Sequence, residues 1–233
     1  MLQVSSGVAS LDPLLRGGFL KPSVIYLVGA PGTGKTTLSM QFVCEGARLN
    51  EKCIYFSTLG EPPLMALSFM SPFSFFNEKY FDENVIEFID LSGAVKEEDF
   101  LDSAVRKIKE NVARLQAQRV VLDSVAPFVL RAKNDFDYRS ILFDLFIDMK
   151  AWGCTTIAIG EIDTMPRGPE HYLADCVIKT GYYRLDRENH KYIQVVKMRG
   201  IAHDTGLHTL KITRDGIMIE EFPSAAILLN GCP

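Results

Sequence analysis

The stretch Gly29-Ala30-Pro31-Gly32-Thr33-Gly34-Lys35-Thr36 decides the fold, because it joins two segments of different character. Before it, Val24–Ala30 is an unbroken apolar run, which is typical of a strand buried on both faces. After it, Lys35–Leu49 has the pattern of a helix. The eight residues fit G-x-x-x-x-G-K-[ST], in which glycines let backbone N–H groups surround phosphate oxygens at a helix N-terminus. The sequence therefore predicts a strand, a phosphate-binding loop and a helix in this order.

Three residues at the end of this loop are expected to complete the contacts to a nucleoside triphosphate and Mg²⁺. Lys35 is expected to reach the β- and γ-phosphates, and the Thr36 hydroxyl to ligate Mg²⁺. Thr37 is counted with the residues that bind the nucleotide. The alternative is a glycine turn that arose by chance, and a full match between a strand and a helix argues against it.

Outward from the loop, apolar strands and helices alternate. A short helix ended by Gly17 and Gly18 is predicted first. Further buried strands are predicted at Cys53–Leu59, Val85–Leu91, Arg119–Val125 and Thr155–Ile162. Helices are predicted within Pro62–Phe81 and over 101–115 and 137–152. The aromatic residues between Phe69 and Phe81 are expected to belong to the core rather than to a partner-binding patch. This alternation is typical of parallel crossover units.

The last third of the chain changes character. Asp175–Tyr183 and Tyr192–Met198 flank the polar turn Leu185–Lys191 and predict an antiparallel hairpin. Two short strands, Thr209–Thr213 and Gly216–Glu220, follow. The expected fold is therefore α/β, with three layers (α/β/α), a mostly parallel central sheet and antiparallel strands at its C-terminal edge.

Length and composition narrow the class of protein. The 233 residues show no repeat or long linker, and one domain over residues 1–233 is expected. The 25 Lys and Arg against 29 Asp and Glu give a net charge of −4, which does not favour binding to nucleic acid or to an anionic membrane. No apolar stretch reaches the ~20 residues of a membrane-spanning helix, and the start lacks the features of a signal peptide. Five cysteines without a CxxC or Cys/His cluster favour free thiols in the cytoplasm.

Two acids follow predicted strands, at the sheet edge where ligands of α/β proteins collect. Asp123 ends the run Val120–Leu122 and is expected to hold the water shell of Mg²⁺, with a turn cap as the alternative. Glu61 follows the second strand and is a candidate base that orients the attacking water. The residues alone favour a solvated loop acid at Glu61.

With the phosphate loop, Glu61 and Asp123 in this order, the chain resembles the RecA-like P-loop ATPases, and among them the KaiC group. Ser6-Gly7-Val8-Ala9-Ser10-Leu11-Asp12-Pro13-Leu14-Leu15 with Gly17-Gly18 is similar to the group's G-x-x-x-LD-x-LL-x-GG opening. The likeness covers nearly the whole chain. It implies a RecA-like fold, binding of ATP or ADP with Mg²⁺, and ATP hydrolysis in a homo-oligomeric ring, such as a hexamer, with a regulatory or signalling role.

The most specific part of the resemblance is Val196-Lys197-Met198-Arg199-Gly200, followed by His203. It implies that Lys197 and Arg199 reach the γ-phosphate bound by the adjacent subunit and neutralise charge in the transition state. It also places His203 near the neighbour's nucleotide. Without the resemblance, these residues would be interpreted as an exposed basic edge strand.

Two departures leave alternatives open. The family usually has paired glutamates where this chain has Gly60-Glu61, so an ATP-binding module with negligible turnover is the alternative to an ATPase. Recombinases have Asn-Gln where this chain has Gly160-Glu161. Glu161 is either a KaiC-type site residue or a buried, paired structural acid. A DNA-stimulated ATPase is the third candidate, but loops 131–137 and 163–172 mix both charges and form no basic stripe.

Overall fold

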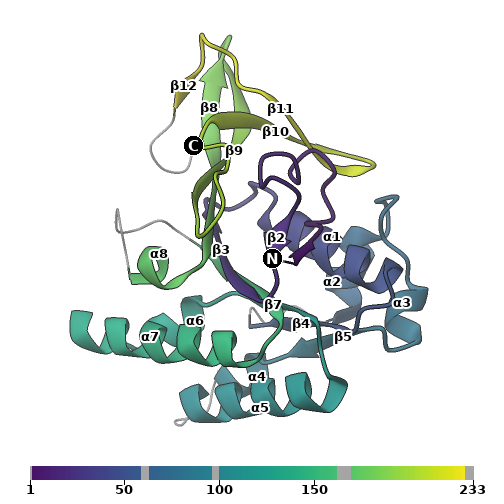
Figure 1. Cartoon of the computed structure of the whole chain (residues 1–233), viewed down its shortest axis with the longest axis vertical. Helices are drawn as coiled ribbons and strands as arrows, with labels where there is room; N and C mark the ends of the chain where they lie inside the picture. The colour runs from purple at the N-terminus through teal and green to yellow at the C-terminus, as the bar shows by residue number, and fades with distance from the viewer. Residues whose placement is uncertain (1, 59–62, 96–99, 162–168, 229–233) are drawn as a thin grey trace.

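The computed structural model describes residues 2–58, 63–95, 100–161 and 169–228, and a large twisted sheet forms their centre (Figure 1). The strand order is β11-β10-β9-β8-β3-β7-β6-β4-β5, and β12 also pairs with β8. The strands of this sheet are β3 Ser23–Gly29, β4 Cys53–Ser57, β5 Ile86–Asp90, β6 Arg119–Asp123, β7 Thr155–Gly160, β8 Cys176–Leu185, β9 Glu188–Met198, β10 Leu207–Thr213, β11 Gly216–Glu221 and β12 Ile227–Leu228. A separate pair joins β1 Gln3–Val4 to β2 Phe19–Leu20.

The sheet is parallel from β8 through β3, β7, β6 and β4 to β5, and antiparallel from β8 to β11. Four of its parallel strands, β3, β4, β6 and β7, are short and buried throughout, as continuous apolar runs predict, whereas β5 at the edge is mostly half-buried. The expected mostly parallel sheet with antiparallel C-terminal strands is confirmed.

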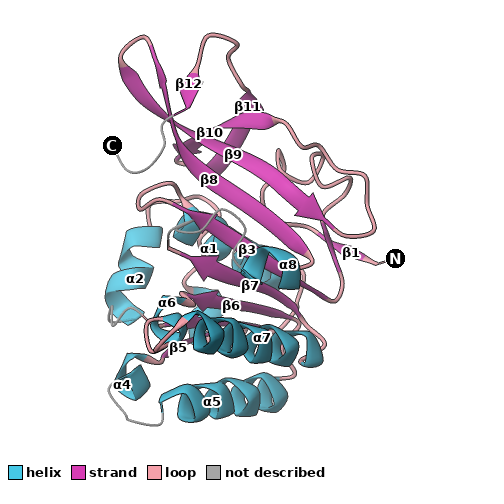
Figure 2. Ribbon diagram, turned by 90° about the vertical axis from the view of Figure 1, so that its left-hand side faces the viewer, coloured by secondary structure: helices cyan, strands magenta, loops and turns pink. Residues whose placement is uncertain are grey.

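Helices cover both faces of the parallel part (Figures 1 and 2). Alternate residues of β3 enter two separate cores: Ile25 and Leu27 belong to the core that contains α1, whereas Val24 and Val28 belong to the one that contains α5 and α7. The two faces explain why every residue of β3 is buried. The helices are α1 Lys35–Arg48, α2 Pro63–Met70, α3 Lys79–Asp82, α4 Ser92–Val95, α5 Phe100–Leu115, α6 Ala126–Val129, α7 Asp135–Ala151 and α8 Pro169–Leu173. The predicted three-layer architecture is therefore confirmed.

Two predicted local structures are wrong. Residues 9–16 form successive turns rather than a helix, and the chain reverses at Arg16, whose φ is 58°. These turns still bury Leu11 and Leu15. The hairpin turn is shorter than predicted, because β8 and β9 continue to Leu185 and Glu188. Asp186 and Arg187 both have positive φ, which is typical of a two-residue turn whose twist suits the two strands.

The aromatic segment behaves as core with one exception. Five of its rings pack against the α1 side of the sheet: Phe73, Phe75, Phe76, Tyr80 and Phe81. Phe69 on α2 is 57% exposed, so the expectation of a core position is wrong for this residue. It lies on the helix surface beside the exposed Leu64 and Met65.

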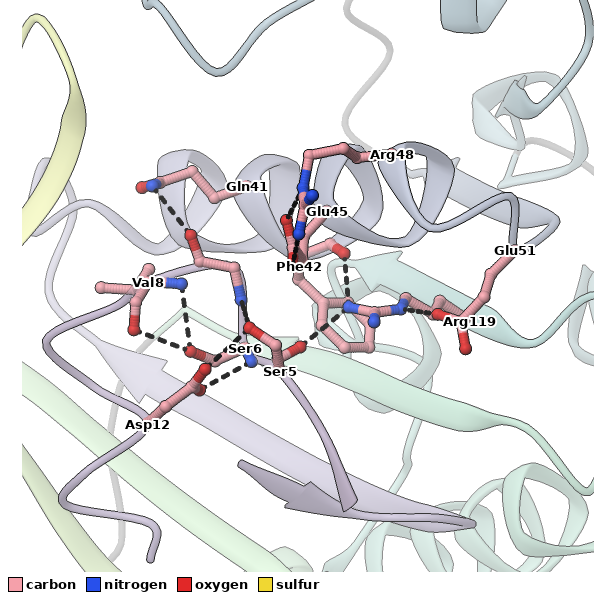
Figure 3. A network of polar contacts seen from close by, with 11 residues as sticks. Ser5, Ser6, Val8, Asp12, Gln41, Phe42, Glu45, Arg48, Glu51 and Arg119 are labelled. Carbon is pink, nitrogen blue, oxygen red and sulfur yellow. Dashed lines mark hydrogen bonds and ion pairs between the residues drawn. The ribbon is translucent and has the colours of Figure 1, made fainter. Parts of the chain in front are cut away.

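The N-terminal segment is fastened to α1 and β6 by a buried arginine (Figure 3). Arg119 on β6 donates to the carbonyls of Ser5 and Phe42 over 2.8 and 2.9 Å and to the Glu51 carboxylate over 2.5 Å. Its guanidinium carbon also lies 4.7 Å from the centre of the Phe42 ring. Asp12 accepts from the Ser5 hydroxyl and the Ser6 N–H, so the N-terminal segment is also held by hydrogen bonds between its own residues.

The cysteines and the helices bear on two further expectations, free thiols and the lack of a membrane-spanning helix. Cys44, Cys53, Cys154 and Cys176 are buried free thiols, whereas Cys232 lies outside the described residues. Within the described ranges, none of the helices has the length and apolar character needed to cross a membrane.

Candidate nucleotide-binding site

The phosphate loop leaves β3 at Gly29 and enters α1 at Lys35. Gly32 and Gly34 have φ values of 73° and 98°, a region that glycine adopts without the steric cost of a Cβ atom. Gly34 is the N-cap and has no side chain to cover the first N–H groups of α1. These N–H groups and the positive end of the helix dipole together suit a phosphate.

Strand β8 supports the loop from one side. A Cβ atom on Gly29 would overlap the hydroxyl and the carbonyl of Thr180. The Thr180 hydroxyl is also 2.8 Å from that of Thr33, and Tyr182 donates to the carbonyl of Pro31 over 2.9 Å. The loop is therefore held in shape by its neighbouring strand.

Lys35 folds back over the loop that it follows. Its Nζ donates to the carbonyls of Gly29 and Ala30 over 2.7 and 3.0 Å. The ammonium group thus already lies above the backbone that would surround the phosphates. A phosphate oxygen at this point gains a charge-assisted hydrogen bond from Nζ.

The predicted metal pair is brought together at the base of the loop. The Thr36 hydroxyl donates to Asp123 Oδ2 over 3.1 Å, and the Tyr55 hydroxyl donates to the same oxygen over 2.6 Å. Burial raises the pKa of the Asp123 carboxyl, while the hydrogen bonds from Tyr55 and Thr36 and the charge of Lys35 lower it in part. A hydroxyl and a carboxylate side by side are the oxygen ligands that Mg²⁺ prefers, so this pair fits the metal.

The ends of β4, β6 and β7 surround this pair with polar groups. Thr58 and Ser124 exchange two hydrogen bonds, of 2.8 Å to the Ser124 N–H and 3.0 Å to its carbonyl. The Ser124 hydroxyl donates to Glu161 over 2.7 Å. Glu161 is thus paired, as the structural interpretation expects, but it is exposed, so the burial that this interpretation also expects is wrong. Thr37 is buried in the first turn of α1, and Glu61 lies outside the described residues.

Lys197 and Arg199 lie away from the phosphate loop of their own chain. Lys197 pairs with Val177 of β8, which lies beside Tyr26 of β3, whereas the loop begins beside Thr180. Three residues along the strands and two strands across correspond to roughly 14 Å. The geometry therefore does not bring these cations to the nucleotide site of the same subunit.

Lys197 is engaged at the end of α8. Its Nζ donates to the carbonyls of His171, Tyr172 and Ala174 over 2.8, 3.1 and 2.7 Å. A cation at a helix C-terminus is favourable because carbonyls without helical partners collect there. Partial burial, followed by the charge of Arg199, lowers the pKa of Lys197.

His203 lies beside the N-terminal turns. Its Nδ1 is 3.2 Å from the carbonyl of Ile201, and the next residue, Asp204, donates its N–H to the carbonyl of Leu14 over 3.0 Å. The buried Nε2 has no hydrogen-bond partner within the described part of the chain. No contact between His203 and the phosphate loop is seen among those residues.

Five contributors to the site were not predicted: Tyr55, Thr58, Ser124, Thr180 and Tyr182. Tyr55 stands in a buried strand beside the one that ends in Asp123, and its polar tip in an apolar run was the available signal. The roles of Thr180 and Tyr182 depend on the pairing of β8 with β3, which the sequence does not reveal.

The sheet, the phosphate loop and the Thr36–Asp123 pair define a P-loop ATPase of RecA-like fold. A family model described as the KaiC ATPase matches residues 4–224, and the chain belongs to this family. A UPF0273 protein of Pyrococcus furiosus is 29% identical, over 93% of each chain. The crystal structure of a KaiC-like protein from Pyrococcus horikoshii is similar with a TM-score of 0.82 and 29% identity, over 95% of this chain and 99% of that one. The circadian clock oscillator protein KaiC of Rippkaea orientalis is 26% identical over 99% of this chain, which spans 45% of that protein.

Proposed function

We propose that this protein binds ATP with Mg²⁺ and hydrolyses it at sites that are completed across the interfaces of a homo-oligomeric ring, and that it serves a regulatory or signalling role. The observation that carries nucleotide binding is the Thr36–Asp123 contact of 3.1 Å beneath the phosphate loop. In this scheme Thr36 and Asp123 hold Mg²⁺, which neutralises charge on the β- and γ-phosphates. Lys35 and the loop N–H groups bind the triphosphate.

The separation of Lys197 and Arg199 from their own phosphate loop supports the assignment across an interface. Cations placed near a bound γ-phosphate stabilise the charge that develops when water attacks phosphorus and ADP leaves. A second copy of the chain can supply them where the same copy does not. Glu61, which follows β4 in the sequence, is the proposed base that orients this water, and His203 is proposed to lie near the neighbour's nucleotide.

The test is steady-state ATP hydrolysis with Mg²⁺ over a range of protein concentrations, with Lys35→Ala as the blank. Activity per subunit should rise with concentration and reach a plateau. Arg199→Ala subunits keep their phosphate loops, and Lys35→Ala subunits keep Lys197 and Arg199. A mixture of the two should regain activity that neither has alone. If activity per subunit is independent of concentration and the mixture stays inactive, sites shared between subunits are excluded.

A second function is favoured by one specific feature, the Gly60-Glu61 sequence in place of paired glutamates. Loss of the first acid removes the usual base, and an ATP-controlled binding module would retain the phosphate loop without turnover. ATP binding measured by calorimetry, combined with hydrolysis no faster than that of Lys35→Ala, would select this function.

A further inference from the structure

A cluster of charged side chains lies at the sheet edge opposite the phosphate loop. Asp175, directly before β8, accepts from Lys150 Nζ over 2.8 Å and from Arg199 Nη1 over 3.3 Å, both at Oδ1. Its other oxygen accepts from the Val24 N–H over 3.0 Å. Asp175 is therefore shared by two cations that come from α7 and from the end of β9.

The backbone fixes Asp175 in this place. Its N–H donates to the carbonyl of Val24, and its carbonyl accepts from the N–H of Arg199, both over 2.8 Å. The two residues thus continue the β3–β8–β9 ladder, with Asp175 directly beside Arg199. Because backbone and carboxylate are both bonded to Val24, the carboxylate is a rigid anchor rather than a flexible counter-ion.

Arg199 and Lys197 are held in different ways. An ammonium group has three N–H donors, and Lys197 has three carbonyl partners. A guanidinium has five donors, and Arg199 uses one on Asp175 and one on the carbonyl of Tyr172, at 2.7 Å. Its side chain is 53% exposed. Arg199 can therefore bind an oxyanion while it keeps its anchors, whereas Lys197 must exchange a partner first.

The anchored cations line a concave surface. A pocket of about 290 Å³ is bordered by Ser23, Lys150, Cys154, Asp175 and Arg199, together with Leu20 and Pro22. With Lys197 beside it, the cluster has three cations against one carboxylate. This excess of positive charge suits a polyphosphate from a neighbouring molecule.

We infer that Asp175 is the positioning residue for Arg199: it holds the guanidinium at its inner edge and presents the remaining donors to the γ-phosphate bound by the adjacent subunit. The inference rests on the proposed function, since it needs Arg199 to act across an interface. Lys150 shares the carboxylate and balances its charge. A misplacement of about 1 Å at a site of phosphoryl transfer lowers the rate by roughly a hundredfold, so the anchor is expected to matter for catalysis.

The experiment tests whether substitution of Asp175 lowers activity only in the subunit that supplies Arg199. Two kinds of subunit are mixed. Donor subunits supply Arg199 and carry Lys35→Ala, so that their own phosphate loops are inactive. Acceptor subunits supply the phosphate loop and carry Arg199→Ala. Donors with an added Asp175→Asn should restore at least tenfold less activity than unmodified donors. Asparagine replaces one carboxylate oxygen by an NH2 group. This group faces either the Val24 N–H or the two cations, all of which are donors, so one of these contacts is lost. The matched control is Asp148→Asn in the donors, because Asp148 forms a similar 2.8 Å ion pair with Lys109 between α5 and α7.

Three further measurements distinguish a positioning role of Asp175 from a structural one. Asp175→Asn placed in the acceptor should leave restored activity unchanged, since the acceptor supplies only the loop. In otherwise wild-type protein it should lower kcat with little change in KM, while light scattering shows the same assembly. If Asp175→Asn fails to fold, Asp175→Glu takes its place, compared with Asp148→Glu. The longer side chain keeps the charge but does not preserve both the Val24 and the Arg199 contacts, so it too should lower donor activity.

Two outcomes distinguish failure of the inference from failure of the proposed function. If the unmodified donor and acceptor restore nothing, sites shared between subunits are excluded and the role of Asp175 with them. If they restore activity, and Asp175→Asn donors do so as well as Asp148→Asn donors, Arg199 acts without Asp175 and the inference is overturned. An equal loss from Asp175→Asn in donor and in acceptor would also overturn it, because a general structural defect has that signature.

Discussion

Replacement of Arg119 by Met should destabilise the protein far more than the loss of a surface arginine. Arg119 is 1% exposed and binds Glu51, the carbonyls of Ser5 and Phe42, and the face of the Phe42 ring. Methionine fills a similar volume but donates no hydrogen bond. The change therefore leaves two carbonyls and one carboxylate without their buried partner.

The expected cost follows from these three groups. Each buried acceptor left without a donor costs about 1–3 kcal/mol, and breaking a buried ion pair costs about 3–5 kcal/mol. Glu51 is partly exposed and keeps Lys21 at 3.5 Å, so the lower part of the range applies. The lower ends of these ranges, taken for two carbonyls and one ion pair, predict a loss of about 5 kcal/mol in the free energy of unfolding. For a chain of this size that corresponds to a fall in Tm of roughly 10–20 °C.

Urea unfolding followed by circular dichroism measures this loss, with refolding checked at each concentration. The control is Arg48→Met, which removes a 2.8 Å ion pair to Glu45 from a side chain that is 61% exposed. That change should cost less than about 1 kcal/mol. If both substitutions shift the midpoint equally, the buried arginine does not fasten the N-terminal segment, and the reasoning from its contacts is refuted.

Asp123→Asn should lower Mg²⁺-dependent hydrolysis by about a hundredfold or more while ATP still binds in EDTA, because the phosphate loop is intact; equal turnover in the variant would remove Asp123 from the metal site. Gly29→Ala should destabilise the fold by about 1–3 kcal/mol and weaken ATP binding, since its Cβ would overlap Thr180, and unchanged binding and melting would contradict that overlap. In a Cys232→Ser background, thiol reagents should react slowly at pH 8, because burial raises the pKa of Cys44, Cys53 and Cys176 to about 12. Rapid modification of native protein by a colorimetric disulfide reagent would show that these thiols are accessible.

The parts of the site that depend on local sequence could be predicted, and those that depend on strand register could not. Lys35 and Thr36 follow from the loop pattern itself. Asp123 followed because parallel strands end at one edge, so an acid at the end of an apolar run must lie near the loop. Asp175 lies directly before β8 and contacts Arg199 only because β8 pairs with both β3 and β9. No spacing in the sequence reports that pairing.

The same limit explains the errors in the fold. The N-terminal turns are stabilised by hydrogen bonds that Asp12 accepts from residues six and seven positions earlier, and these compete with a regular helix. The exposed ring of Phe69 reflects which face of α2 turns outward, and a run of apolar residues does not specify a face. Long apolar segments with a clear boundary, such as β3 and β6, left no comparable ambiguity.

If the proposed ring forms, strand β8 connects the nucleotide site of one subunit to the arginine that this subunit presents to the next. It starts beside Asp175, which anchors Arg199, and within five residues it reaches Thr180, which touches the phosphate loop. A paired strand in the interior of a sheet is stiff, so a shift at one of these points is expected at the other. Nucleotide binding in one subunit would then be coupled to the position of the arginine that this subunit presents to the next. By thermodynamic linkage the coupling free energy is the same in both directions, so contact of the arginine with the neighbour's nucleotide would change nucleotide affinity in its own subunit equally.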